Sequence, residues 1–344
     1  MARYKFILTI LLFPVITFPQ KFPDTEIDSL LTLGISQIVN QNYGNANKTF
    51  NVLDSLHPEL PLGKTYKAAL LIAKSTDYAE KYNVKRINKL LDSAKVRCEA
   101  LLNSNEADVW NNYFMALTLG YKAYFRILTD NYIDAFLDGY RSVQYFERCK
   151  DIEPDFYESY LAIGTYKYWK SAKASSLNWL PFFTDNRKEG IKLLEEAVRN
   201  SSYNKYLALN SLIWIYINEK NDEKAIEVAE QALKDFPGSR FFMWGLARAY
   251  EDVDIDKAIN IFYRIRKSLQ AESHLSNINN VILLHKIAML NHKTGNLSES
   301  LKLLTEIENI KLNGEEKERL ENRLRRVKQL KNEILQSLSG RQNR

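Results

Sequence analysis

The chain has 344 residues, 45% of them hydrophobic and 26% charged, so it is neither a disordered chain nor too short to bury a large core. Its formal net charge is +6, and residues 311–344 supply most of it with ten Lys or Arg against five Asp or Glu. The nearly neutral remainder argues against a broad nucleic-acid-binding face, so we expect no nucleic-acid partner.

The N-terminus has the pattern of a secretory signal peptide over residues 1–20. Arg3 and Lys5 precede an apolar run from Phe6 to Phe18, and these thirteen residues are too few to span a bilayer as a helix. We expect cleavage near Gln20, although no A-x-A triplet marks the site. An uncleaved anchor is the alternative. The sequence therefore predicts an exported protein, periplasmic or secreted, with no stable membrane insertion after signal removal.

Residues 21–154 are predicted to form divergent helical hairpins. Apolar residues recur at three- and four-residue steps from Trp110 to Leu128 and again from Tyr132 to Lys150, which predicts a long hairpin. Cys98 and Cys149 each lie near the end of a predicted second helix. In an exported protein they could form a disulfide. We favour two separate core thiols, because a chain of this length does not need a covalent staple.

Residues 206–237 contain the most regular pattern in the chain. The first helix has an apolar face, and a polar turn follows it at residues 219–222. The second helix has a stripe of small residues, which lets two helix axes approach closely, and Pro237 ends the unit. The apolar face consists of Leu209, Leu212, Ile213 and Tyr216, and the small stripe of Ala225, Ala229 and Ala232.

The small residue that opens the second helix recurs as Gly190, Ala225, Ala258 and Ser300, at steps of 35, 33 and 42 residues. This repeat resembles the tetratricopeptide repeat (TPR), a helical hairpin of about 34 residues, as found in exported bacterial proteins. Leu209 and Ile213 depart from the family, which prefers Trp and Gly there. The resemblance implies an all-α solenoid of stacked antiparallel helix hairpins, with TPR-like repeats over residues 155–310.

In TPR proteins the first helix of each hairpin lines a concave groove, so the resemblance implies partner-binding residues on these helices. An aromatic and polar groove suits a protein or peptide partner. For each of these side chains, packing against neighbouring helices is the alternative. The candidates are Asn111, Tyr168, Asn210, Trp214, Trp244, Arg248, His285 and His292.

An insertion at residues 172–185 interrupts the repeats. Trp179, Phe182 and Phe183 surround Pro181 there, and we expect this loop to fold back onto the core or to contact a ligand. Folding back is the interpretation we favour, with the groove as one place that the loop could fill. The aromatic residues over 166–183 also support a second hypothesis, an envelope carrier or sensor for a small hydrophobic or carbohydrate ligand.

Residues 311–344 are predicted to form a basic C-terminal capping helix and tail. An apolar stripe at three- and four-residue steps predicts that this helix covers the last repeat. Basic amphipathic helices can also bind anionic membranes, but four interleaved glutamates favour capping. The stripe consists of Leu320, Leu324, Val327, Leu330, Ile334 and Leu338.

Catalytic motifs are missing from the sequence. There is no G-x-S-x-G elbow, glycine-rich phosphate loop or C-x-x-C pair. His285 and His292 lie two turns apart on one helix, but no acid or cysteine at ligand spacing flanks both. We therefore expect a non-enzymatic scaffold without cofactor or metal that binds a protein or peptide. The sequence predicts neither the partner's identity nor the oligomeric state.

Overall fold

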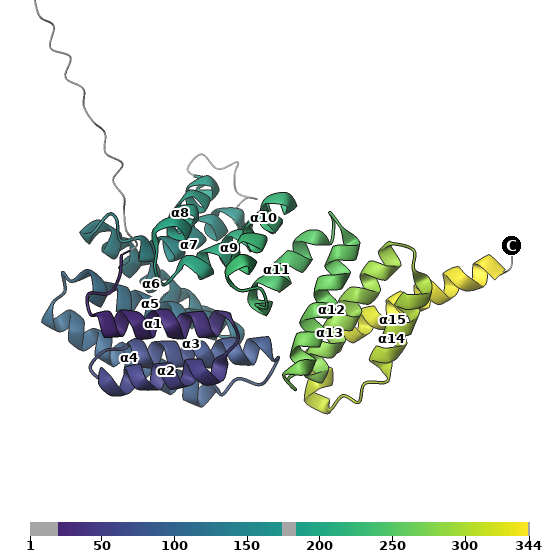
Figure 1. Ribbon diagram of the computed structural model, residues 1–344, viewed down its shortest axis with the longest axis horizontal. Helices are drawn as coiled ribbons and strands as arrows, with labels where there is room; N and C mark the ends of the chain where they lie inside the picture. The colour runs from purple at the N-terminus through teal and green to yellow at the C-terminus, as the bar shows by residue number, and fades with distance from the viewer. Residues whose placement is uncertain (1–19, 174–183, 343–344) are drawn as a thin grey trace, which may run out of the picture.

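The computed structural model describes residues 20–173 and 184–342. The described chain consists of α-helices in antiparallel hairpins, stacked in chain order (Figure 1), which confirms the predicted all-α solenoid. The helices are α1 Thr25–Val39, α2 Tyr43–Leu56, α3 Leu62–Asp77, α4 Val84–Ser104, α5 Val109–Leu128, α6 Tyr132–Ile152, the 3-10 helix η1 Tyr157–Ser159, α7 Tyr160–Lys173, α8 Arg187–Asn200, α9 Lys205–Asn218, α10 Asp222–Asp235, α11 Arg240–Tyr250, α12 Ile255–Ala271, α13 Asn277–Lys293, α14 Leu297–Glu308 and α15 Gly314–Gln342.

The hairpin over residues 206–237 forms as predicted. Helices α9 and α10 pack against each other through Ala225, Ala229 and Ala232, all of which are fully buried. Lys220 lies in the connecting turn with φ of 57°, and the N–H of Asn221 donates to the carbonyl oxygen of Tyr216 at 2.9 Å. This left-handed residue with its returning hydrogen bond ends one helix and aims the next one back along it.

The same turn recurs between other helices. Turns of this kind occur at positions 41, 79, 130, 273 and 295, where the residue has a positive φ. In each turn the N–H of the next residue donates to a carbonyl oxygen in the last turn of the preceding helix. Of these, only the last is glycine. Repetition of one local geometry keeps successive helices antiparallel, which is what builds the solenoid.

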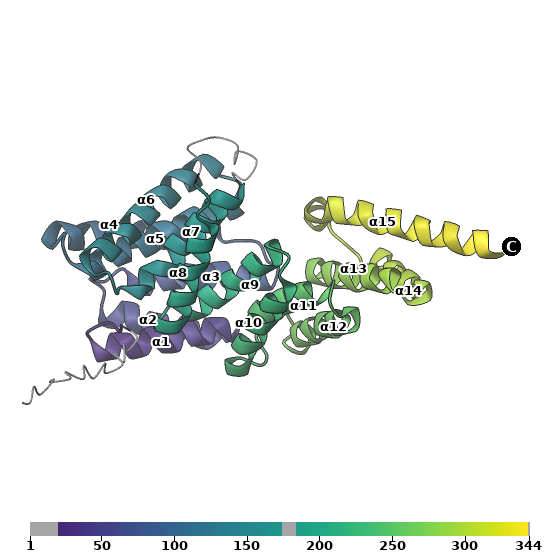
Figure 2. The same ribbon diagram turned by 90° about the horizontal axis from the view of Figure 1, so that it is seen from above.

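The long hairpin and the capping helix are also confirmed. Helices α5 and α6 contain 20 and 21 residues, against 14 in each of α7 to α10. Helix α15 runs beside α13 and α14 (Figure 2), with Leu320, Val327 and Ile334 buried against them. Cys98 and Cys149 are separate buried thiols, which agrees with the interpretation we favoured.

The solenoid departs from simple neighbour-to-neighbour stacking where α1 and α3 meet α11. The turn after α1 and the end of α3 touch the start of α11, far along the chain. Ser239 Oγ donates to the carbonyl oxygen of Val39 at 2.7 Å, and the N–H of Arg240 donates to Gln41 Oε1 at 2.9 Å. We call this contact the Arg240 junction. It joins the N-terminal hairpins directly to the C-terminal ones.

Arg240 is the charged centre of the junction. Its side chain is 1% exposed, yet its guanidinium has two carboxylate partners. Nη2 lies 2.7 Å from Asp77 Oδ2, and Nη1 lies 2.6 Å from Glu272 Oε1. Burial acts to raise the pKa of the Glu272 carboxyl, but hydrogen bonds and charge from Arg240 hold it below its usual value. One buried cation therefore links α3, α11 and α12.

Two further contacts extend the junction toward α13. The rings of Tyr78 and His274 stack with centroids 4.0 Å apart, and Asn279 Nδ2 donates to the carbonyl oxygen of Asp77 at 2.8 Å. The residues after α3 are thereby held against the start of α13.

We predict that Arg240→Ala lowers the free energy of unfolding by about 3–5 kcal/mol, because removing one member of a buried ion pair leaves its partner without compensation. Urea denaturation followed by circular dichroism measures the change. Arg264→Ala is the matched control, since Arg264 is exposed and its guanidinium donates to the carbonyl oxygen of Pro237 at 3.4 Å, with no ion pair among the described residues. Equal stability losses in the two variants would contradict the role of Arg240.

Candidate functional site

Two of the predicted groove residues are buried in the structure. Tyr168 is fully buried; its hydroxyl donates to Glu219 Oε1 at 2.7 Å and accepts from Asn218 Nδ2 at 2.7 Å. His285 is buried beneath α15. In this arrangement both side chains pack inside the protein, so neither presents a surface to a partner.

Two others are engaged in contacts within the chain. Asn111 Nδ2 donates to the carbonyl oxygens of Leu101 and Asn105, which ties the end of α4 to the start of α5. The guanidinium of Arg248 lies 2.8 Å from the carboxylate of Glu251, the residue that follows the same helix. These bonds give both residues a local structural role.

The remaining groove candidates are at least partly open to solvent. Trp214 is 39% exposed on α9. Asn210, one turn away, has a buried Oδ1 without a hydrogen-bond partner. Trp244 and His292 are half-buried. Trp179, Phe182 and Phe183 lie outside the described residues, so the structure does not place the predicted aromatic loop.

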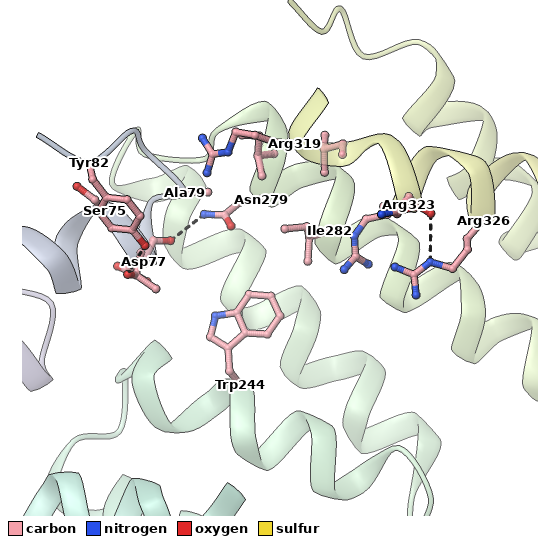
Figure 3. A pocket seen from close by; sticks show the side chains of 14 residues that line it. Ser75, Asp77, Ala79, Tyr82, Trp244, Asn279, Ile282, Arg319, Arg323 and Arg326 are labelled. Carbon is pink, nitrogen blue, oxygen red and sulfur yellow. Dashed lines mark hydrogen bonds between the residues drawn. The ribbon is translucent and has the colours of Figure 1, made fainter. Parts of the chain in front are cut away.

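Trp244 is the predicted residue that lies in a cleft. The cleft has a volume of about 490 Å³ and opens between the turn after α3, the helices α11 and α13, and the N-terminal half of α15 (Figure 3). We call it the arginine cleft. Its lining residues are Ser75, Thr76, Asp77, Ala79, Tyr82, Trp244, Ile278, Asn279, Ile282, Arg319, Leu320, Asn322, Arg323 and Arg326.

Three arginines line the α15 side of the cleft. Arg319, Arg323 and Arg326 are spaced by four and three residues, so they share one face of the helix. Figure 3 shows them along α15, with Trp244 on the facing side. Among the residues that the structure describes, no carboxylate oxygen lies within 4.0 Å of a guanidinium nitrogen of these three arginines, so none of them forms a salt bridge.

The carboxylate that lines the cleft does not neutralise these arginines. It belongs to Asp77, and both of its oxygens accept hydrogen bonds from the guanidinium of Arg240. The negative charge of Asp77 is therefore balanced by Arg240, and the cleft keeps an excess of positive charge from the three arginines of α15.

His285 holds Arg323 in place. Arg323 Nη1 donates to His285 Nδ1 at 3.1 Å, and an arginine has no acceptor, so the ring must be neutral with its proton on Nε2. Burial, together with the charges of Arg323, Arg326 and Lys286, lowers the pKa of His285 to about 4. The neutral ring thus accepts a hydrogen bond from the Arg323 guanidinium, and it carries no charge that would neutralise this arginine or attract an anion away from it.

The wall opposite the arginines is aromatic and apolar. Trp244 packs edge-on against Phe262, with ring centroids 5.8 Å apart, and Ile278 and Ile282 lie beside it. Guanidinium groups facing a tryptophan and aliphatic side chains can bind a ligand that carries both an anion and an apolar part.

Sequence reasoning identified Trp244 but missed the three arginines. It assigned α15 to capping, and the apolar stripe does cap α13 and α14. The signal lay one residue away, since Arg319, Arg323 and Arg326 each precede a residue of that stripe. Asp77 and Arg319 line the same cleft although about 240 positions separate them in the chain. Without the fold, the sequence could not predict that they lie close together.

Metal binding finds no support in the described ranges 20–173 and 184–342. They contain no group of three or more His, Cys, Asp or Glu side chains arranged to hold an ion.

No family model and no curated protein matches the chain. Solved structures do show similarity. The C-terminal part of a TPR repeat-containing protein from Cytophaga hutchinsonii is 15% identical with a TM-score of 0.42, and the match covers 83% of this chain and 97% of that one. A human IFIT1 dimer with PPP-AAAA is 14% identical with a TM-score of 0.44, and the match covers 85% of this chain and 73% of that one. Yeast Tom70 is 14% identical with a TM-score of 0.38, and the match covers 92% of this chain and 67% of that one. At these scores the similarity carries no functional argument.

We predict that His285 makes the stability of the chain fall in mild acid. Its pKa of about 4 lies below the ordinary value of 6.5, so as the pH falls from 6.5 toward 4 the unfolded chain binds a proton that the folded chain does not. Urea unfolding at several pH values should therefore show a shallower loss of stability in His285→Asn, which keeps an acceptor but does not titrate. An unchanged pH slope, or an NMR titration of this ring near its ordinary pKa, would contradict the assignment.

Proposed function

We propose that this protein is an exported, non-enzymatic scaffold that binds an acidic segment of a partner protein in the arginine cleft. The observation that carries the proposal is a set of three guanidinium groups that face Trp244 across the cleft and have no carboxylate partner in the described part of the chain. The proposal of export rests on the basic and apolar pattern of residues 1–20.

The charge of the cleft favours an acidic ligand. Three like charges on one helix face repel one another, and the nearest lining carboxylate is paired with Arg240. Asp or Glu side chains of a partner would relieve that repulsion, and each could form paired hydrogen bonds with a guanidinium.

The shape and the remaining lining favour a protein segment over a small anion alone. A cleft of about 490 Å³ accommodates several side chains, and its lining residues on α15 extend from Arg319 to Arg326. Trp244 and the isoleucines of α13 offer contact area to an apolar residue of the same segment, while the arginines hold its acids. Tryptophan and arginine are also the residues that most often dominate binding energy at protein interfaces.

The rigidity of the cleft supports the same function. The turn after α3 is held by Arg240 and Asn279, and Arg323 is held by His285. A preformed site loses less conformational entropy on binding, so a modest number of contacts can give useful affinity.

We predict that the triple substitution of Arg319, Arg323 and Arg326 by Glu abolishes capture of the partner. Affinity purification from the cell envelope, followed by binding measurements with the partner recovered, should show a weakening of at least about 30-fold, because losing a desolvated charged contact costs about 2–5 kcal/mol. Trp244→Ala should weaken binding without altering its dependence on salt, since it removes contact area but no charge.

Arg325→Glu is the matched control. Arg325 lies on the same helix but is exposed and outside the cleft, with Nη2 bonded to Asn322 Oδ1. A partner that binds the triple variant as tightly as the Arg325→Glu variant would overturn the proposal. Native mass spectrometry that finds a retained small ligand would instead support the carrier hypothesis.

A further inference from the structure

A second cavity, which shares no lining residue with the arginine cleft, lies among the first hairpins. It has a volume of about 330 Å³ and lies between the end of α2, the start of α3 and the first half of α4, three helices that pack together (Figure 1). We call it the basic pocket. Its lining residues are Asp54, Lys64, Lys67, Arg86, Lys89, Leu90 and Ser93.

Asp54 holds two lysines on the α3 side of the basic pocket. Lys64 Nζ lies 2.6 Å from Asp54 Oδ1, and Lys67 Nζ lies 3.1 Å from Asp54 Oδ2. The two lysine side chains are 19% and 17% exposed. Burial acts to raise the pKa of the Asp54 carboxyl, but hydrogen bonds and charge from both lysines hold it below its usual value. One ionised carboxylate is therefore shared between two ammonium groups.

Gly63 lets Asp54 come this close to the start of α3. A Cβ atom at position 63 would lie 2.5 Å from Cβ and 2.6 Å from Cα of Asp54, so a larger residue would push the two backbones apart. The carboxylate is thereby fixed beside the first turns of α3, where Lys64 and Lys67 lie three residues apart on one face. Helix packing, and not side-chain flexibility alone, sets the position of these charges.

Helix α4 adds two cations that have no internal partner. Arg86 and Lys89 are three residues apart and Ser93 follows four residues later, so these side chains share the face of α4 that lines the pocket. In the parts of the chain that the structure describes, neither cation has a carboxylate oxygen within 4.0 Å of a side-chain nitrogen. The basic pocket thus contains four cations and one carboxylate, a net charge of +3.

The other acids of α2, α3 and α4 are already paired within the chain. They are Asp77, Asp92 and Glu99, whose partners are Arg240, Lys122 and Lys95. Apart from Asp54, the three helices contain no further Asp or Glu. The excess positive charge of the basic pocket is therefore not balanced by the helices that form it.

We propose that the basic pocket binds a small anion that carries phosphoryl groups. Phosphate oxygens accept hydrogen bonds from several directions; a lysine binds them as a point charge and an arginine can form paired hydrogen bonds. Lys64 and Lys67 would meet such an anion from α3, and Arg86 and Lys89 would meet it from α4. The hydroxyl of Ser93 would add a neutral donor.

The length and charge of the pocket favour a diphosphate over a carboxylate. Arg86 and Ser93 are seven residues apart, which is about 10 Å along the helix axis, so the cations are distributed along a trough. A carboxylate would bring one charge to one end of this trough, whereas a diphosphate presents charged oxygens along its length and balances more of the net charge. Binding here is independent of partner binding in the arginine cleft.

Isothermal titration calorimetry of the full chain with sodium diphosphate and with inorganic phosphate tests the proposal. Sodium chloride keeps the ionic strength constant, so that general screening does not change. We expect saturable binding that is tighter for diphosphate. The double variant Arg86→Gln with Lys89→Gln should bind diphosphate at least about tenfold more weakly, because it removes two charged contacts. Both side chains are exposed, so thermal melting should confirm that this variant keeps its fold.

Lys85→Gln with Arg97→Gln is the matched control. It removes the same charge from the same helix, but both residues are exposed and neither lines the pocket. The triple Glu variant of the arginine cleft should likewise keep diphosphate binding. Absence of saturable binding, or an equal loss in the matched control, would contradict the proposal. So would loss of binding in the cleft variant, or a peptide rich in Asp and Glu that binds the basic pocket more tightly than diphosphate.

Phosphoryl groups occur both in soluble anions and in lipid headgroups, and a vesicle experiment separates these two sources. No described helix combines the length and apolar content needed to cross a membrane. Co-sedimentation with phosphatidylcholine vesicles that contain phosphatidic acid, lost in the Arg86→Gln, Lys89→Gln variant, would assign the pocket to a headgroup. Diphosphate binding without co-sedimentation would assign it to a soluble anion.

Discussion

The buried Arg240 guanidinium is the interaction on which the rest of the structure depends. A stack of helical hairpins is held together by contacts between neighbours, and nothing in that pattern requires distant hairpins to touch. Arg240 pairs with Asp77 from the N-terminal hairpins and with Glu272 from the C-terminal ones. Because the cation is almost fully buried, the pairing is sensitive to geometry, and it sets the position of α3 relative to α11–α13.

The arginine cleft is a consequence of that position. Its lining comes from the turn after α3, from α11 and α13, and from α15, which are far apart in the chain. The same ion pair that brings these parts together also engages the carboxylate of Asp77, so among the described residues the cleft arginines of α15 have no carboxylate in salt-bridge contact. The ion pair between Arg240 and Asp77 therefore affects both the shape of the cleft and its charge.

Regular and irregular parts of the chain have different roles. The hairpin α9–α10 follows the repeat pattern closely, and its small residues are fully buried in packing. The arginine cleft lies where the pattern breaks, beside a capping helix that exposes arginines next to its apolar stripe. A repeat position is constrained by the helix beside it, whereas an irregular position is free to meet solvent or a partner.

The sequence alone determined the local structure: the helices, their antiparallel pairing, the long hairpin at residues 109–152 and the capping role of α15. These depend on spacings of three and four residues and on turns between neighbours, which a sequence records directly. Only the tertiary structure decided which groove candidates are open. Tyr168, His285, Trp214 and Trp244 were all predicted to line the groove, yet residues at the end of α9 enclose Tyr168 and α15 covers His285. Burial at these positions depends on contacts between segments that are far apart in the chain. The burial of Arg240 has the same cause, because Asp77 and Glu272 reach it from distant helices.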